Sequence, residues 1–209
     1  MAGKQESRKK REKDQRKQEV LSIALGLFSE RGVRNVSMQE IADKAEYSVG
    51  TLYNLFAGKE AMFDELFENC SSQVKEAFLT VLEGPGTESE RLSLFIKSMP
   101  DILEEHAEFI RLYVAETGQR PGNVSQPKNI DDLKSTLNIA LLAIIGDGIQ
   151  KGLFRHVDPH IAAKAIGALL ETLAFEITEP FNKSEMMEVF AKVEHLFLKG
   201  LLLPGGHRS

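Results

Sequence analysis

The stretch that decides the fold is residues 36–63, VSMQEIADKAEYSVGTLYNLFAGKEAMF. It holds two short helical patterns joined by a tight connection. Ser37 and Glu40 form an S-x-x-E capping box, in which each side chain bonds the other residue's backbone N–H, so a helix is expected to begin directly after Ser37. Ile41, Ala42 and Ala45 give this helix one apolar side. The pattern is typical of a helix-turn-helix unit, whose second helix reads DNA.

The second helical pattern is small, rich in hydroxyl groups and nearly uncharged. Ser48 is placed as its N-cap, and Leu52 and Phe56, four residues apart, share a buried face. The opposite face can lie against a polyanion without burying an unpaired charge. We therefore expect this face to enter the major groove of DNA. The groove-facing positions are Ser48, Gly50, Thr51, Tyr53 and Asn54.

These residues resemble the DNA-binding domain of the tetracycline-repressor (TetR) family, whose pattern runs roughly T-x-x-x-I-A-x-x-A-G-V-S-x-G-T-x-Y-x-Y-F-x-x-K-E-x-L. The resemblance is close over about residues 18–66, and beyond them it is one of length and helix layout. The matching positions are Ser37, Ile41, Ala42, Ala45, Ser48, Gly50, Thr51, Tyr53, Phe56, Lys59 and Glu60. We also expect Tyr47 to contact DNA, with Ser37 and Lys59 at phosphates.

The chain departs from the family pattern at two adjacent positions. Glu46 stands where the family usually has Gly, and Tyr47 stands where it has a small apolar residue. A Gly at the end of the first helix would suit a left-handed backbone, which other residues adopt uncommonly. Either Glu46 is strained or the turn differs. We favour a solvated turn carboxylate over one that repels phosphate or accepts from a cytosine amino group.

Charge is distributed unevenly along the chain. The net charge of −5 by itself argues against a nucleic-acid partner, but residues 1–59 hold 12 Lys or Arg against 8 Asp or Glu. Residues 1–17 alone have 8 basic and 3 acidic positions. An extended segment of this length reaches on the order of 50 Å and could follow the minor groove. The expected contacts are Arg8, Lys9, Lys10 and Arg11, and the alternative is a disordered, solubilising leader.

Length and composition are those of a globular protein with two cores. The chain has 209 residues, 42% of them hydrophobic, and a single cysteine. No run of 18 apolar residues and no secretory leader is present, so we expect a cytoplasmic protein without a membrane partner. No phosphate-binding, dinucleotide-binding or nucleophile-elbow motif occurs, so we expect no enzyme and no cofactor. His156, Asp158 and His160 resemble metal ligands, but Asp158 before Pro159 is better explained as a helix start, so no metal is expected.

Nearly all of the chain after Lys59 has helical periodicity. We expect an all-α protein of about nine helices, with the clearest linker at Glu83-Gly84-Pro85-Gly86 and a second capping box at Thr87 and Glu90. We expect the chain to divide into three parts. Residues 1–16 form a basic flexible arm, residues 17–62 the helix-turn-helix DNA-binding domain, and residues 63–204 a helical regulatory and dimerisation domain.

Members of the TetR family pair through their two C-terminal helices, which implies a homodimer. A two-fold pair matches a palindromic operator because each protomer reads one half-site. The last two helical segments each have an apolar face, and the alternative to an interface is that this face packs in an ordinary monomeric core. The candidate interface residues are Ile161, Ala165, Leu169, Leu173, Met186, Val189, Phe190, Val193 and Phe197.

The resemblance also implies a repressor that a small, largely apolar effector releases from the DNA. The alternative is a helix-turn-helix protein that acts through a protein partner and has no small-molecule pocket. Simple core packing is the other explanation for each candidate pocket residue. These candidates are Phe67, Phe95, Met99, Leu103, Phe109, Tyr113, Asn138, Leu142, Glu171 and Phe175.

Overall fold

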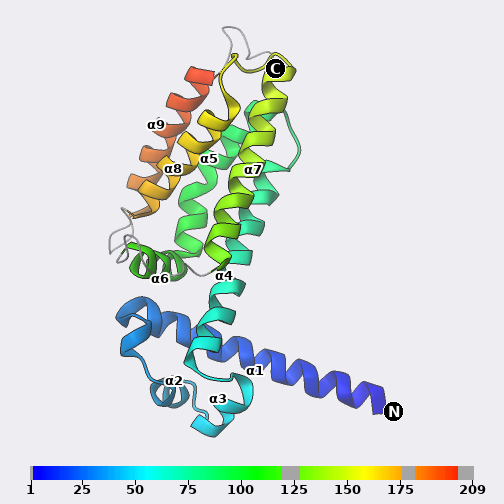
Figure 1. Ribbon diagram of the computed structural model, residues 1–209, viewed down its shortest axis with the longest axis vertical. Helices are drawn as coiled ribbons and strands as arrows, with labels where there is room; N and C mark the ends of the chain where they lie inside the picture. The colour runs from blue at the N-terminus through cyan, green and yellow to red at the C-terminus, as the bar shows by residue number, and fades with distance from the viewer. Residues whose placement is uncertain (1, 119–127, 176–181, 202–209) are drawn as a thin grey trace. The chain divides into compact units, whose positions relative to one another are not determined.

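The computed structural model describes residues 2–118, 128–175 and 182–201, and within these ranges it consists of helices and short connections without a β-strand (Figure 1). This confirms the all-α prediction. The helices within the described ranges are α1 (Ala2–Arg31), the short 3-10 helix η1 (Val33–Asn35), α2 (Met38–Lys44), α3 (Val49–Leu55), α4 (Lys59–Leu82), α5 (Glu88–Glu105), α6 (Ala107–Gly118), α7 (Lys128–Gln150), α8 (Pro159–Phe175) and α9 (Lys183–Leu201).

The chain folds into two compact units. Unit 1 comprises the residues up to Cys70 together with helix α6 from Glu108, and unit 2 comprises residues 71–107 and the chain from α7 onward. Helix α4 therefore runs from unit 1 into unit 2 without a break. The expected domain boundary at residue 62 falls inside α4, and α6 lies with the helix-turn-helix rather than with the other C-terminal helices.

Helix α1 is longer than the sequence pattern indicates. Residues 1–16 were expected to form a flexible arm, but the helix begins at Ala2. The first half has no apolar face to bury. It continues a helix whose second half is packed, so it avoids the cost of nucleation. Ion pairing between Arg8 and Glu12 at 2.8 Å and the hydrogen bond from Gln15 to Glu19 at 3.2 Å join successive turns.

The helix starts agree with the capping residues that the sequence indicates. Ser37 and Glu40 form a complete capping box at α2, and Thr87 and Glu90 form another at α5. Ser48 caps α3 by accepting from the backbone N–H of Thr51 at 3.1 Å. The Asp158 carboxylate accepts from the backbone N–H groups of His160 and Ile161, which confirms its assignment as the N-cap of α8.

The core of unit 1 is built by α1, α2, α3, α4 and α6 together. A row of aromatic rings crosses it: Phe28 meets Phe63 at 6.2 Å between centroids, Phe63 meets Phe67 at 5.6 Å, and Phe67 meets Phe109 of α6 at 4.9 Å. Leu112 of α6 is fully buried in the same cluster. Helix α6 thus supports the helix-turn-helix from behind, together with α1 and α4.

In unit 2, α5 packs against α9 and α7 packs against α8. Gly148 of α7 leaves room for the segment that follows the helix, because a Cβ there would lie 2.2 Å from the ring of the fully buried Phe154. The linker between α4 and α5 lies where the sequence predicts it, between Leu82 and Glu88. Buried Glu88 bonds Lys151 at 2.6 Å and Arg91 at 3.1 Å, which ties the start of α5 to the end of α7.

Candidate nucleic-acid interface

Helix α3 separates a buried face from an exposed polar face. Leu52 is fully buried in the core of unit 1, and Phe56 directly after the helix is also buried. Tyr53 is 56% exposed although it is a large aromatic residue, and Asn54 beside it is exposed as well. An exposed Tyr next to an amide gives a surface that can form both apolar contacts and hydrogen bonds with base edges. The orientation expected for the second helix is therefore the one observed.

The turn between α2 and α3 places Glu46 in a left-handed conformation, with φ of 57°. The backbone N–H of Tyr47 donates to the carbonyl of Ala42 at 2.9 Å, and that of Glu46 donates to Asp43 at 3.2 Å. These two bonds form a Schellman motif, which satisfies the last carbonyls of α2 and normally has Gly at the left-handed position. Of the two alternatives, strain at Glu46 is the correct one, and its side chain is exposed.

Replacing Glu46 with Gly is expected to stabilise the protein. A non-Gly residue in the left-handed conformation costs about 1–2 kcal/mol of folding free energy, which Gly avoids. Gly in turn loses about 0.5–1 kcal/mol, because its unfolded chain has more conformational freedom to give up on folding. We expect Glu46→Gly to raise the free energy of unfolding by about 0.5–1 kcal/mol and the melting temperature by roughly 1–4 °C. Glu46→Gln is the matched control, since it removes the charge but keeps the Cβ. An equal gain in both variants, or none in Glu46→Gly, would contradict the strain.

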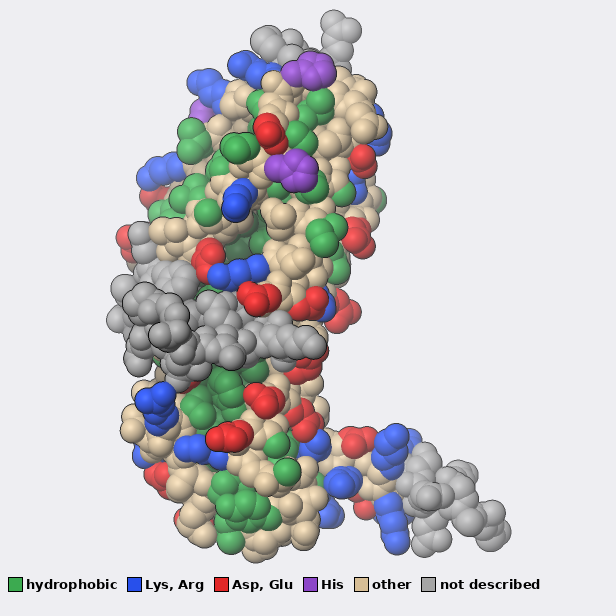
Figure 2. Space-filling view, in the orientation of Figure 1, with side chains coloured by type: hydrophobic (Ala, Val, Ile, Leu, Met, Phe, Trp, Pro, Cys, Tyr) green, Lys and Arg blue, Asp and Glu red, His purple; other side chains and the backbone are tan. Residues whose placement is uncertain are grey.

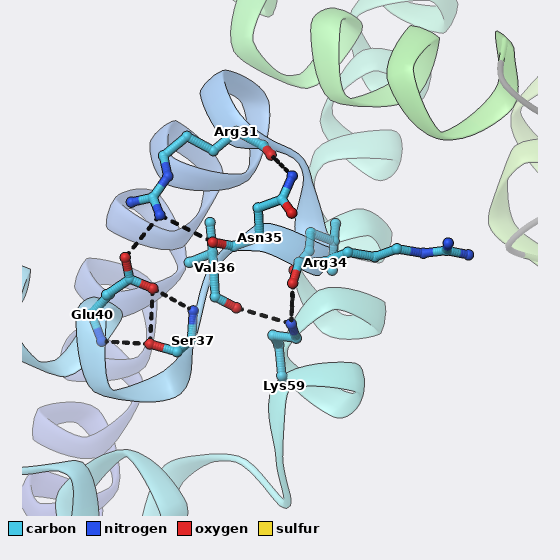
Figure 3. A network of polar contacts seen from close by, with 8 residues as sticks. Arg31, Arg34, Asn35, Val36, Ser37, Glu40 and Lys59 are labelled. Carbon is cyan, nitrogen blue, oxygen red and sulfur yellow. Dashed lines mark hydrogen bonds and ion pairs between the residues drawn. The ribbon is translucent and has the colours of Figure 1, made fainter.

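A polar network joins the end of α1 to the start of α2 (Figure 3). The Glu40 carboxylate accepts from the backbone N–H and the hydroxyl of Ser37, each at 2.8 Å, and from the Arg31 guanidinium at 2.8 Å. Arg31 also donates to the carbonyl of Asn35 at 3.0 Å, and the Asn35 amide donates back to the Arg31 carbonyl at 2.8 Å. The Ser37 hydroxyl, expected at a phosphate, is held by this network. Its structural role is to cap α2.

The network makes stability depend on pH through Glu40. Hydrogen bonds from Ser37, and then from Arg31, lower the pKa of Glu40 from 4.5 to about 2. A carboxyl with a depressed pKa in the folded state stabilises fully above its unfolded value and loses that contribution as the pH falls from 4.5 to about 2. We expect Glu40→Gln to lower the melting temperature at pH 6 and to converge with the wild type near pH 2. A difference in melting temperature that is constant with pH would contradict this assignment.

Lys59, the first residue of α4, was expected at a phosphate but is held elsewhere. Its ammonium group donates to the carbonyls of Val33 at 2.8 Å and Val36 at 2.9 Å, with a longer contact to Arg34 at 3.5 Å (Figure 3). Since an ammonium has three donors, these carbonyls occupy it. Lys59 therefore fastens α4 to the connection between α1 and α2, and its expected phosphate contact stays a prediction.

Tyr47, for which a DNA contact stays a prediction, has partners within unit 1. Its hydroxyl donates to the Glu19 carboxylate of α1 at 3.1 Å, and its ring packs against the core of unit 1. Burial and the neighbouring Glu19 raise the pKa of the Tyr47 phenol. Tyr47 therefore joins the turn to α1. The Ser48 and Thr51 hydroxyls bond each other at 2.8 Å at the exposed start of α3.

The basic residues of the expected arm lie on the helical extension of α1, where Figure 2 shows Lys and Arg side chains gathered. Arg8 pairs with Glu12, and Lys9 borders a groove beside α3. Lys10 and Arg11 follow at 100° steps and so occupy other faces of the helix. The four residues thus do not act as one cluster. A helix 10–12 Å wide cannot itself lie inside a minor groove about 6 Å wide, so only its side chains could enter the groove. The expected DNA contact of these four residues stays a prediction.

The candidate pocket residues do not converge on one described cavity. Phe67, Phe109 and Tyr113 belong to unit 1, where the two Phe rings pack face to edge. Asn138 is exposed, and Glu171 forms an ion pair with Lys134 at 2.7 Å. The other candidates in unit 2, Phe95, Met99, Leu103 and Leu142, are buried or half-buried core residues. The Phe175 side chain lies outside the described residues.

The candidate interface residues divide into two groups. Ile161 and Ala165 of α8 are exposed, with Ile161 at 68%. Phe190 is fully buried, and Val193 and Leu173 are less than 10% exposed, so these three side chains pack inside unit 2. The burial of these three residues is thus accounted for within one protomer, and their part in an interface stays a prediction. The half-buried candidates are Leu169, Met186, Val189 and Phe197.

Cys70 is half-buried in unit 1, where burial raises the pKa of its thiol to about 11 and the Glu108 carboxylate adds to the shift. It is therefore a structural thiol and not a reactive one. Across the described ranges, no group of three or more His, Cys, Asp and Glu side chains is arranged to hold a metal ion. None of the helices in the described part of the chain is long and apolar enough to cross a membrane.

A braced helix-turn-helix with an exposed reading helix, continuous through α4 with a second all-helical unit, defines a DNA-binding transcriptional regulator. Comparison with known proteins identifies the family. The model for bacterial regulatory proteins of the tetR family matches residues 20–66, and the model for the tetracyclin repressor-like C-terminal domain matches residues 85–175. The chain belongs to the TetR family.

Similar proteins are themselves transcriptional regulators. The HTH-type transcriptional repressor KstR2 of Mycobacterium tuberculosis is 31% identical over 141 residues, which span 67% of this chain and 70% of that protein. The fatty acid metabolism regulator protein of Bacillus subtilis is 26% identical over 187 residues, 88% of this chain and 94% of the relative.

Solved structures share the fold. The ketosteroid transcriptional regulator KstR2 of Mycobacterium tuberculosis gives a TM-score of 0.72 at 23% identity, covering 90% of this chain and 96% of that one. The transcriptional regulator FadR of Bacillus subtilis in complex with stearoyl-CoA gives a TM-score of 0.71 at 21% identity, covering 88% of this chain and 98% of that one.

Proposed function

We propose that this TetR-family regulator is a homodimeric repressor that binds a palindromic operator through α3 and is released by a small, largely apolar effector. One observation supports the DNA contact above all others. Helix α3 keeps Leu52 and Phe56 in the core and leaves Tyr53 and Asn54 exposed, side by side, on a helix fixed at both of its ends. A protein of this kind acts on the chromosome and thus in the cytoplasm.

In a dimer, the distance between the two α3 helices controls the affinity for the operator. Two α3 helices that read one face of a duplex must lie about 34–36 Å apart, or a multiple of that. Ile161 and Ala165 on the exposed face of α8 support pairing through this part of unit 2. Because α4 is continuous from unit 1 into unit 2, a ligand that shifts α4 would alter the spacing.

The chemical class of the effector is suggested by the similar proteins. One is described as a ketosteroid regulator, and another was solved with stearoyl-CoA. A ketosteroid has an apolar ring system and stearoyl-CoA an apolar acyl chain attached to a charged CoA group, and unit 2 of this chain has an apolar core that includes Phe95 and Met99. A fatty-acyl thioester or a sterol derivative is therefore the proposed effector class. Changing the DNA affinity 100-fold would take about 2.7 kcal/mol of coupling between the two sites.

The proposal can be tested with the full chain and the DNA next to its coding gene. A footprint on that DNA should protect a palindrome, with protein bound as a dimer. Adding stearoyl-CoA or a ketosteroid should then release the protein, with the unliganded protein as control. Binding that neither molecule weakens would remove the proposed effector class and favour the alternative, regulation through a protein partner. Failure to bind any segment of that DNA would overturn the proposed function.

A further inference from the structure

A groove of about 530 Å³ lies between the helical extension of α1 and the reading helix α3, within unit 1. It is open to solvent. Lys9, Glu12, Lys13 and Arg16 of α1 line one wall, and Thr51, Asn54 and Leu55 of α3 line the other. Asn54 thus borders both the groove and the surface of α3 that we propose to read DNA. A long helix that starts well before its packed half creates this groove, and a disordered arm would not.

The wall formed by α1 is a basic stripe. Lys9, Lys13 and Arg16 are spaced i, i+4 and i+7, so they lie within about 60° of one another around the helix. All three are exposed, in a segment with no buried apolar side chain before Val20. Glu12 is the one acidic residue in the wall. Its pKa is lowered by Arg8, which bonds it at 2.8 Å and offsets its charge.

Lys17, the residue directly after Arg16 on α1, holds the groove in shape. Lys17 Nζ donates to the Glu65 carboxylate of α4 at 2.6 Å and lies over the Phe56 ring at 5.1 Å from its centroid. These contacts fix α1 against both the end of α3 and the start of α4. Lys17 is therefore a positioning residue, and the exposed basic residues Lys9, Lys13 and Arg16 before it project from a fixed base.

We propose that this groove binds one phosphodiester strand of the DNA, alongside the major groove that α3 enters, with Lys9, Lys13 and Arg16 as the phosphate ligands. The inference rests on the proposed function, because it requires α3 to lie in the major groove. A helix in the major groove lies between the two sugar-phosphate backbones. The α1 extension beside α3 would therefore contact one of these backbones and not the bases. The wall formed by α3 adds neutral groups, chiefly the Asn54 amide, that can donate to phosphate oxygens.

The extension thereby supplies the positive charge that α3 lacks. Between Ser48 and Phe56 there is no Lys or Arg, so α3 itself cannot neutralise phosphates. The extension places three cations on the wall of the groove that faces α3. Phosphate contacts of this kind set the register and raise the affinity without reading sequence. Affinity for any duplex, including one without an operator, is then expected to depend on the stripe.

The test compares two lysines of the same helix in the full-length protein. Lys13 lines the groove, and Lys10 lies about 60° beyond it around the helix, outside the groove lining. Binding of Lys13→Ala, Lys10→Ala and the wild type to a mixed-sequence duplex of about 30 bp, three helical turns, is measured by fluorescence anisotropy across a series of salt concentrations. Circular dichroism and the melting temperature confirm that each variant keeps its fold.

We expect Lys13→Ala to reduce the slope of log K against log salt by about 0.9 for each protomer bound, and to weaken binding about eightfold per protomer at 0.1 M salt. Lys10→Ala should change the slope by less than half as much. Equal effects of the two variants would show diffuse charge attraction and overturn the groove, as would no effect of either. An unchanged slope in Lys13→Ala together with tight operator binding would reject the groove while leaving the proposed function intact.

Discussion

Truncating Phe67 to Ala is expected to lower the free energy of unfolding by about 3–5 kcal/mol. The Phe67 ring is fully buried in unit 1 and contacts Phe109 at 4.9 Å and Phe63 at 5.6 Å between centroids. Its removal leaves a cavity between α4 and α6, where the neighbouring rings can collapse only in part. Urea unfolding of the full chain, followed by circular dichroism, measures the loss. The value also decides whether Phe67 is a core residue or lines an open pocket.

The matched control is Phe78→Ala, the same truncation on the same helix. Phe78 is half-buried in unit 2, against Phe95 at 5.5 Å. Its truncation removes less buried apolar surface, and a loss of about 1–2 kcal/mol is expected. Equal losses from the two variants would mean that the Phe67 ring lies at an open surface. That result would restore Phe67 as a candidate for the effector pocket.

Replacing Lys59 with Met is expected to destabilise the protein by about 2–3 kcal/mol. Met keeps most of the apolar stem but cannot donate, so the carbonyls of Val33 and Val36 lose their 2.8 Å and 2.9 Å partners. Hydrogen bonds to a charged donor contribute more than neutral ones, and a carbonyl left without a partner in a partly buried site adds its desolvation cost. Thermal unfolding measures the loss.

The control for Lys59 is Lys44→Met, at the exposed end of α2. Removing this charge should change the free energy of unfolding by less than about 1 kcal/mol. If Lys59→Met were as mild as the control but weakened DNA binding strongly, Lys59 would be a phosphate ligand, as the family pattern implies. A stability loss with DNA affinity reduced only in proportion to it supports the positioning role.

Helix starts were predictable from sequence because capping is local. Ser37 with Glu40, Thr87 with Glu90 and Asp158 each bond backbone groups within three residues, so the capping residue and its partners appear together in the sequence. The left-handed turn at Glu46 was predictable for the same reason, from a pattern in which Gly is usual.

Contacts between distant residues were not predictable. The partners of Lys59 lie 23–26 residues away, and the packing of α6 against the helix-turn-helix depends on Phe109 meeting Phe67. An apolar residue on a helix shows that one face is buried but not what covers it. For that reason the candidate pocket and interface residues mixed true core positions, such as Phe190, with exposed ones, such as Ile161.

The helical conformation of the α1 extension was not predictable for a different reason. A helix is recognised in a sequence by an apolar stripe, and the residues before Val20 have no such stripe. The composition of this segment indicates its positive charge but not its conformation, so an extended arm and a helix are equally compatible with it. Continuity with a packed helix and pairs such as Arg8 with Glu12 decide the conformation instead.

The central claim is that the exposed face of α3 reads DNA, and the most direct measurement is operator affinity of Tyr53→Ala. Leu94→Ala is the control, because Leu94 is also 56% exposed but lies on α5 in unit 2. Anisotropy titrations use the palindrome protected next to the coding gene, at one salt concentration. We expect Tyr53→Ala to bind at least about 30-fold more weakly, the loss typical of an interface hot spot, with an unchanged melting temperature. Leu94→Ala should bind as the wild type does. Wild-type affinity in Tyr53→Ala would contradict the account.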